Sequence, residues 1–388
     1  MKIKVLLNGV GRIGKAILKI MLENKNFEIV AINEINPYLE NIVYSINHDS
    51  TYGNISNKFK VIENNFIENC SSKIKILNHK NLADIDLSNI DIIIDASGVK
   101  EDINLLKNLP VKAIFLTHPS SHADINVILG VNEQNLDTNL HKIISTSSCN
   151  ATALLPALKI IDENYEILCG DIVTIHPLLN HQRVLDGNFV SSQTRDVEYN
   201  FEFGRSSTQN IIPNKTTTIN ACSYVLPKIN AELISSSSLR VPTDTVGVIN
   251  VTLMTKKECS KDEVIELFEK YEKNQKFPIV LNNYEPLVSS DFKKENKTTI
   301  IDHRYTDVKN NHMIKLLVWY DNEWGYASKV VDILNFYKSI EKIGYIALFF
   351  CALIFWIKVI NITFFIVFMI KDAKMFKKSF SRSSFCRF

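Results

Sequence analysis

Cys149 and His176 are the two residues of this chain whose types and setting point most directly to covalent chemistry. Cys149 follows a hydroxyl-rich turn and precedes a long apolar stretch, residues 153–161, which predicts a helix that starts at the cysteine. The unpaired N–H groups and partial positive charge of a helix start favour a thiolate over a thiol. His176 ends a strand-like run, residues 171–176. A thiolate at a helix start beside a strand-borne imidazole is an arrangement suited to nucleophilic catalysis.

Either residue by itself has a plainer interpretation. A single cysteine is usually a small buried hydrophobic residue, and a single histidine is usually a core or surface residue whose hydrogen bonds are satisfied. The catalytic interpretation therefore depends on what the other parts of the chain add.

The start of the chain predicts a dinucleotide-binding turn. Residues 3–7 form an apolar run typical of a buried strand, and Gly9, Gly11 and Gly14 follow with the spacing G-x-G-x-x-G. A helical pattern comes next, and then a second strand at residues 27–33. In this context the glycines allow a tight turn, a close approach of a pyrophosphate and close helix–strand packing. Glu34 can accept hydrogen bonds from ribose hydroxyls and would repel a 2′-phosphate, which favours NAD over NADP.

Alternating strands and helices predict an α/β fold with a doubly wound parallel sheet over the first 150 residues. Further apolar runs lie at residues 90–96, 113–116 and 143–144. After residue 170 the pattern changes to longer alternating strands, at 246–253 and 314–319, with a helix at 261–271, and this predicts an α+β second domain. Residues 185–210 have no periodicity and are interpreted as a long loop. We therefore expect a nucleotide-binding domain at 1–149 and a catalytic domain at 150–322.

Composition excludes several classes of protein. The chain has 388 residues, 46% of them hydrophobic, and a net charge of +2. The excess of positive charge lies after residue 341, so the preceding part has no concentrated basic face of the kind that binds nucleic acid. Seven scattered cysteines without a C-x-x-C pair argue against a metal site or a disulfide framework and fit a reducing cytoplasm. We see no secretory signal at the start.

Six motifs occur in an order that resembles the glyceraldehyde-3-phosphate dehydrogenase family. The resemblance covers residues 1–338, and the last two motifs are specific to that family. The motifs are Asn8–Gly14, Asp49–Gly53, Ser148–Asn150, Gln209–Pro213, Leu239–Thr243 and Trp319–Tyr326.

The resemblance implies a mechanism. Cys149 would attack an aldehyde phosphate to form a hemithioacetal, His176 would hold the thiolate as an ion pair and then act as base, and hydride would pass to NAD. Inorganic phosphate would then cleave the thioester. The resemblance also implies that the protein is a homotetramer and that a final helix at 323–338 completes the first domain. Residues 185–210 would reach toward the cofactor of a neighbouring subunit.

The resemblance also assigns binding residues. The fixed fork of Arg240 suits the substrate phosphate, Ser148 and Thr216 would supply hydroxyls to phosphate, and Asn322 would hold the nicotinamide carboxamide. The full set implied at the cofactor is Asn8, Gly9, Gly11, Arg12, Ile13, Gly14, Asn33, Glu34, Ser97, Gly98, Thr117, Asn322 and Tyr326.

Departures from the family pattern are concentrated at the substrate. Asn150, Leu179 and His181 each stand where the family has a residue with a hydroxyl group. Thr217 stands where the family has a glycine. Asn150 can still donate to an anion, Leu179 cannot, and His181 would do so better when protonated.

Two other functions follow from these departures. The related erythrose-4-phosphate dehydrogenases lack the same threonines, and they carry a His-Pro pair like His118–Pro119 and a motif like Pro286–Phe292; in that case water would open the thioester. The second alternative belongs to a different class of protein, a membrane-associated binding protein that has lost its dehydrogenase activity.

A tail at 341–388 extends beyond the family resemblance. Residues 343–370 are largely apolar and are followed by basic residues, so the segment is long enough to cross a bilayer with tilt. Lys358 near its middle is costly for a span, at roughly 2.5–3.5 kcal/mol. The tail therefore has two interpretations. It is a membrane tether, or it is out-of-frame or read-through sequence.

Overall fold

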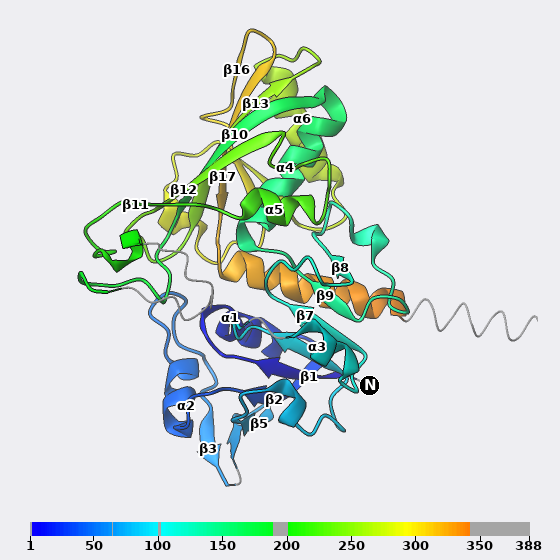
Figure 1. The fold of residues 1–388 in the computed structure, drawn as a ribbon, viewed down its shortest axis with the longest axis vertical. Coiled ribbons are helices and arrows are strands. Elements are labelled where there is room, and N and C mark those ends of the chain that lie inside the picture. The colour runs from blue at the N-terminus through cyan, green and yellow to red at the C-terminus, as the bar shows by residue number, and fades with distance from the viewer. Residues whose placement is uncertain (1, 64, 100–101, 189–200, 342–388) are drawn as a thin grey trace, which may run out of the picture. The chain divides into compact units, whose positions relative to one another are not determined.

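Two β-sheets organise the residues that the structure describes. The computed structural model describes residues 2–63, 65–99, 102–188 and 201–341. Figure 1 shows the strands of the first sheet in blue to cyan and those of the second in green to orange. The predicted tail and part of the predicted loop at 185–210 lie outside the described residues.

The first sheet has a parallel centre, as the sequence predicts. Strand β1 lies between β2 and β6, so the strand order reverses beside β1, and helix α1 packs against β1 and β2. Because the strands are parallel, their carboxyl ends share one edge of the sheet, which is where ligands bind in such sheets. The central elements are β1 (Ile3–Asn8), α1 (Arg12–Leu22), β2 (Phe27–Asn33), β6 (Ile92–Asp95), β7 (Ala113–Leu116) and β9 (Ile143–Ser145).

One edge of this sheet differs from the predicted, purely parallel arrangement. Strands β3, β4 and β5 pair in antiparallel fashion beyond β2, because short turns can join only antiparallel neighbours. At the other edge β8 pairs with β9 in parallel fashion, as predicted. These elements and the remaining helices are α2 (Leu39–Asn47), β3 (Lys60–Ile62), β4 (Phe66–Glu68), β5 (Lys73–Leu77), η1 (Leu82–Asp84), α3 (Ile103–Asn108), β8 (Ile125–Asn126) and η2 (Glu133–Asn135).

The second sheet contains eight strands and is mainly antiparallel. Side chains of β13 alternate between buried and partly exposed, which is typical of a sheet with one face on the core. The strands are β10 (Ile167–His176), β11 (Ile212–Asn214), β12 (Ile234–Arg240), β13 (Gly247–Thr255), β14 (Val280–Asn283), β15 (Thr299–Asp302), β16 (Asp307–Lys309) and β17 (Met313–Tyr320).

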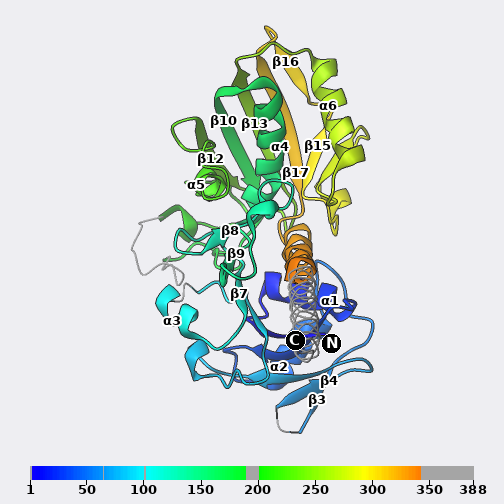
Figure 2. The same ribbon diagram turned by 90° about the vertical axis from the view of Figure 1, so that its right-hand side faces the viewer.

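Helix α4 (Cys149–Tyr165) packs against this second sheet (Figure 2). Eleven of its residues are buried, so the apolar stretch that predicted the helix also explains its position. Helix α6 (Lys261–Asn274) runs three residues beyond the prediction and begins with a capping box between Ser260 and Glu263. The remaining elements are η3 (Phe201–Gly204), α5 (Thr218–Ser223) and η4 (Ser289–Phe292).

Residues 324–335 are helical, as predicted, and residues 336–341 are helical as well. Among the described residues we find no helix with the length and apolar character to cross a bilayer. The same residues contain no cluster of three or more His, Cys, Asp or Glu side chains that could hold a metal ion.

Candidate active site

Cys149 is the first residue of α4, as the sequence predicts. The Ser148 side chain caps the helix by accepting from the backbone N–H of Ala151 at 3.3 Å. Ser147 has a positive φ of 59°, an uncommon conformation for a residue with a side chain. The hydroxyl of Tyr326 donates to the Ser147 carbonyl at 3.0 Å. Tyr326 therefore holds the turn that presents the thiol, and the role of Ser148 in this structure is that of a helix cap.

His176 faces the cysteine from the end of β10. Its Nε2 lies 3.9 Å from Sγ of Cys149, and its Nδ1 lies 2.9 Å from the carbonyl oxygen of Pro177. Because a carbonyl only accepts, this contact assigns a proton to Nδ1 and leaves the lone pair of Nε2 directed at the thiol. The imidazole is thus held in the tautomer that can accept the thiol proton.

The ionisation of the two groups differs from the sequence prediction. Burial raises the pKa of Cys149 to about 11, although Arg240 and backbone N–H groups act in the opposite direction. Burial, together with the positive charge of Arg240, lowers the pKa of His176 to about 3. The N–H groups of the helix start thus favour the thiolate in the predicted direction, but burial outweighs them. The two groups can ionise together by transfer of one proton, which leaves the net charge of the pocket unchanged and lets the two charges stabilise each other.

Arg240 lies beside this pair because strands β10 and β12 are parallel and His176 and Arg240 are in register. Nε and Nη1 of the guanidinium are buried and have no hydrogen-bond partner among the described residues. An unpaired buried cation is costly, and a bound anion removes that cost through charge-assisted hydrogen bonds. The arrangement therefore fits a phosphate group held close to the reactive thiol.

Asn150 takes part in a chain of buried polar side chains behind the cysteine. Its Oδ1 accepts from the hydroxyl of Tyr320 at 2.6 Å and from the Cys149 thiol at 3.4 Å. Its Nδ2 donates to Oγ1 of Thr218 at 3.1 Å, and that oxygen lies 2.6 Å from Oγ1 of Thr216. Both ends of the Asn150 amide are therefore engaged by protein, in contrast to the prediction that the amide donates to a substrate anion.

The other departures from the family pattern are placed around Arg240 and at the start of α5. His181 is half-buried, and burial together with the charge of Arg240 lowers its pKa. Leu179 is half-buried and donates its backbone N–H to Oε1 of Gln182 at 2.8 Å. Thr217 is exposed and its side chain makes no capping hydrogen bond to α5.

The glycine turn has the shape that a pyrophosphate needs. A Cβ on Gly14 would lie 2.1 Å from the carbonyl oxygen of Gly9, and a Cβ on Gly9 would lie 2.7 Å from Cα of Ser97. At Gly11, by contrast, no atom lies within 4 Å of the position that a Cβ would occupy. Gly9 and Gly14 therefore allow close packing, whereas Gly11 leaves open space above the helix start.

A cavity of about 230 Å³ adjoins this turn at the carboxyl edge of the sheet. Glu34 lies at its wall, with carboxylate oxygens that accept from the N–H groups of Val10 at 3.1 Å and Asn36 at 3.2 Å. Its remaining lone pairs can accept from hydroxyls of a nucleotide. The cavity is lined by Asn8, Gly9, Gly11, Asn33, Glu34, Ile35, His79, Lys80, Ala96, Ser97 and Val99.

The polar residues at the base of the cavity are hydrogen-bonded to one another. Asn33 donates to Oδ1 of Asn8 at 2.8 Å, and Asn8 donates to Oδ1 of Asp95 at 2.9 Å. Ser97 donates to the same carboxylate at 2.7 Å, and Thr117 donates to the Asp95 carbonyl at 2.9 Å. These side chains therefore fix the floor and edge of the pocket. Gly98 has a φ of +74° at its rim, and Ile13 is half-buried in the first turn of α1.

Asn322 and Arg12 are engaged in different ways. Oδ1 of Asn322 accepts from the Val246 N–H at 3.0 Å and from the Thr245 hydroxyl at 3.2 Å. Its Nδ2 has no hydrogen bond to any described residue, so it is free to donate to an acceptor such as a carboxamide oxygen. The guanidinium of Arg12 instead donates to Glu323 at 2.6 Å and to Thr51 at 2.7 Å. The Arg12 side chain therefore turns toward protein through Nε and Nη2.

Sequence reasoning missed the residues that support the predicted ones. Tyr320 and Thr218 hold Asn150, while Tyr52 and Thr245 lie behind Asn322. Three of them lie within or beside the family motifs, but their contacts join segments up to 272 residues apart. No local pattern indicates such pairings.

Comparison with known proteins gives a consistent result. Residues 3–103 match the family described as "Glyceraldehyde 3-phosphate dehydrogenase, NAD binding domain", and residues 148–322 match the corresponding C-terminal domain. The chain is 31% identical over 340 residues to glyceraldehyde-3-phosphate dehydrogenase 2 of Bacillus subtilis, an alignment that covers 86% of this chain and 96% of the relative. It is 33% identical over 339 residues to the protein of the same name from Staphylococcus aureus (strain Mu50), covering 86% and 95%.

A relative above 30% identity is thus matched over nearly its whole length, and both domain families occur in the expected order. The chain belongs to the glyceraldehyde-3-phosphate dehydrogenase family of NAD-dependent oxidoreductases.

Proposed function

We propose that this protein oxidises glyceraldehyde 3-phosphate with NAD and inorganic phosphate, through a thioester on Cys149. The observation that carries the proposal concerns two buried guanidinium nitrogens of Arg240 next to the Cys149–His176 pair, which have no hydrogen-bond partner in the described part of the chain. A reactive thiol, a base and an unpaired cation at one place suit a substrate with an aldehyde at one end and a phosphate at the other. The names of the relatives point to the same substrate.

The first step joins the aldehyde to the protein. Sγ of Cys149 attacks the aldehyde carbon as Nε2 of His176 takes the thiol proton, and return of that proton to the carbonyl oxygen gives the hemithioacetal. Arg240 binds the phosphate of the substrate and so orients the carbonyl toward sulfur. When bound, NAD accepts the hydride that leaves this carbon. Nε2 of His176 takes the hydroxyl proton at the same time, and the product is a thioester.

The second step releases the product. An oxygen of inorganic phosphate attacks the thioester carbonyl, the C–S bond breaks, and sulfur recovers its proton from His176. The acyl phosphate is the product. Thr216, Ser148 and His181 are the side chains that we propose around the two phosphate positions, whereas Asn150 holds the pocket from behind.

At the cofactor we propose that Gly11 and the first turn of α1 bind the pyrophosphate and that Glu34 binds the adenosine ribose. Asn322 donates Nδ2 to the nicotinamide carboxamide. The proposed domains are 1–149 with 323–338, and 150–322, and the proposed assembly is a homotetramer. Erythrose 4-phosphate is the second candidate substrate, because Leu179 cannot donate to a phosphate.

The role of Arg240 is tested with the substitution Arg240→Gln. We expect the KM for glyceraldehyde 3-phosphate to rise by at least tenfold, since a charge-assisted hydrogen bond contributes about 1.5–3 kcal/mol. Activity with unphosphorylated glyceraldehyde should fall less, because only the effect of Arg240 on the thiol pKa is then lost. An equal loss with both aldehydes would contradict a phosphate-binding role.

A further inference from the structure

We propose that Thr245 and Tyr52 are positioning residues that set the orientation of the Asn322 amide and thereby the affinity for the nicotinamide end of NAD. The inference rests on the proposed contact between Asn322 and the carboxamide. All three side chains are at least 95% buried, with exposed fractions of 1% for Thr245 and 5% for each of the others. Their arrangement is fixed by hydrogen bonds that leave one amide orientation favoured.

Two donors converge on the oxygen of the Asn322 amide. The backbone N–H of Val246 donates to Oδ1 at 3.0 Å, and the hydroxyl of Thr245 donates to it at 3.2 Å. If the amide were rotated by 180°, its NH₂ group would face these two donors, and both would lose their acceptor. The pair therefore keeps Nδ2 on the opposite side, where it makes no hydrogen bond to a described residue and can donate to a ligand.

Tyr52 anchors the residues on either side of Asn322. Its hydroxyl donates to Oδ1 of Asp321 at 2.7 Å and lies 3.1 Å from Oγ1 of Thr245. Asp321 is fully buried, and its carboxylate together with burial raises the pKa of Tyr52 well above its ordinary value. Tyr52 thus keeps its proton and gives it to Asp321. Its oxygen accepts from the backbone N–H of Trp324 at 3.3 Å, so Tyr52 holds the chain on both sides of Asn322 and lies beside the Thr245 hydroxyl.

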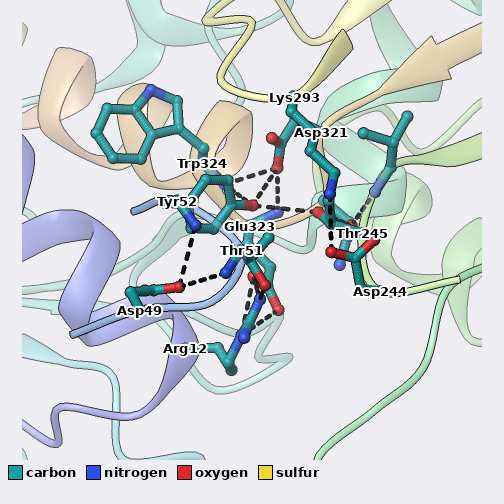
Figure 3. A network of polar contacts seen from close by, with 12 residues as sticks. Arg12, Asp49, Thr51, Tyr52, Asp244, Thr245, Lys293, Asp321, Glu323 and Trp324 are labelled. Carbon is teal, nitrogen blue, oxygen red and sulfur yellow. Dashed lines mark hydrogen bonds and ion pairs between the residues drawn. The ribbon is translucent and has the colours of Figure 1, made fainter. Parts of the chain in front are cut away.

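The same network reaches the glycine turn, as Figure 3 shows. The backbone N–H of Glu323 donates to Oδ1 of Asp321 at 3.0 Å, and Glu323 forms the ion pair with Arg12 at 2.6 Å. The guanidinium of Arg12 lies 5.9 Å from the centre of the Tyr52 ring. Thr245 and Val246, just before β13, therefore hold Asn322 directly, and its neighbour Glu323 is held by Arg12 at the start of α1. Such support is what a precise contact at the far end of the cofactor requires.

The test compares binding of NAD with binding of ADP-ribose, which lacks the nicotinamide ring, by titration calorimetry. Thr245→Val removes one hydrogen-bond donor, so we expect NAD to bind about threefold to tenfold more weakly, and ADP-ribose to bind as to the wild type. Thr245→Ser keeps the hydroxyl and should restore NAD affinity. Tyr52→Phe, a second variant that removes only a hydroxyl, should weaken NAD binding in the same selective way.

Thr255→Val is the matched control. Thr255 is also 1% exposed, and its hydroxyl donates to the His312 and Lys257 carbonyls, away from Asn322. It should lower stability without changing either affinity. Equal weakening of NAD and ADP-ribose in Thr245→Val, or no change in either, would overturn the inference.

Asn322→Ala separates this inference from the role of Asn322 itself. If this variant still binds NAD as well as the wild type does, the proposed carboxamide contact fails. If it loses NAD affinity while Thr245→Val and Tyr52→Phe do not, only the positioning role fails.

Discussion

Nε2 of His176 lies 3.9 Å from Sγ of Cys149, while Nδ1 of the same ring is anchored on the Pro177 carbonyl. The anchor fixes both the tautomer and the direction of the imidazole. Because burial disfavours either charge alone, with a pKa of about 11 for the thiol and about 3 for the imidazole, the thiolate depends on its partner.

Replacing His176 should change the pH dependence of thiol reactivity. In His176→Asn nothing nearby can take the proton, so the thiol should ionise only as the pH approaches its raised pKa of about 11. We expect labelling of Cys149 by iodoacetamide at pH 7 to be at least tenfold slower than in the wild type, with the two rates converging toward pH 11. The rate is followed by peptide mass spectrometry, with the exposed Cys70 as an internal reference. Equal rates for Cys149 at pH 7 would contradict the dependence on His176.

A charge at Asn150 should suppress the thiolate. The substitution Asn150→Asp keeps the size of the side chain but places a carboxylate where Oδ1 now lies, 3.4 Å from Sγ. Like charges raise the pKa of the thiol, so we expect slower labelling by iodoacetamide at pH 7 and a lower kcat. Tyr320→Phe removes the hydrogen bond to the same oxygen without adding charge and serves as the comparison. The account of Asn150 fails if both variants label at the wild-type rate.

His181 should make anion binding stronger in acid. Burial and Arg240 lower its pKa, so the ring is neutral at pH 7 and gains its proton only as the pH falls. The added cation then lies near Arg240 and attracts anions. Sulfate keeps its charge over this range and is the appropriate probe. Its inhibition constant against the aldehyde phosphate should fall as the pH drops below 6.5, the ordinary pKa of histidine, and the fall should be smaller in His181→Gln. An identical pH dependence in the two proteins would exclude this role for His181.

Hydrophobic periodicity predicts the fold where each element is defined by its own residues. The buried runs at β1, β2 and β7, and the alternating pattern of β13, identify strands without help from distant residues. Strand β12 has the serine-rich sequence ISSSSLR, which has weak strand character, and it was missed. It is held by pairing with β10 and β11, which no local pattern reveals.

For the candidate site, the sequence likewise predicts the features that depend on local residues and not those that depend on the whole fold. Cys149, His176 and the glycine turn carry their chemistry in their residue types and spacing, whereas the direction of the thiol pKa depends on burial created by the whole fold. In the same way, Asn150 is engaged by Tyr320, 170 residues away along the chain, and could not be distinguished from a substrate ligand beforehand.

The central claim is tested most directly by following NADH formation with glyceraldehyde 3-phosphate and with erythrose 4-phosphate, each with and without inorganic phosphate. Because phosphate is proposed to cleave the Cys149 thioester, we expect sustained NADH formation only with glyceraldehyde 3-phosphate and phosphate together. Without phosphate a single burst of about one NADH per site should appear, since the thioester then accumulates. Sustained phosphate-independent turnover of erythrose 4-phosphate, with no phosphate-dependent turnover of glyceraldehyde 3-phosphate, would contradict the account.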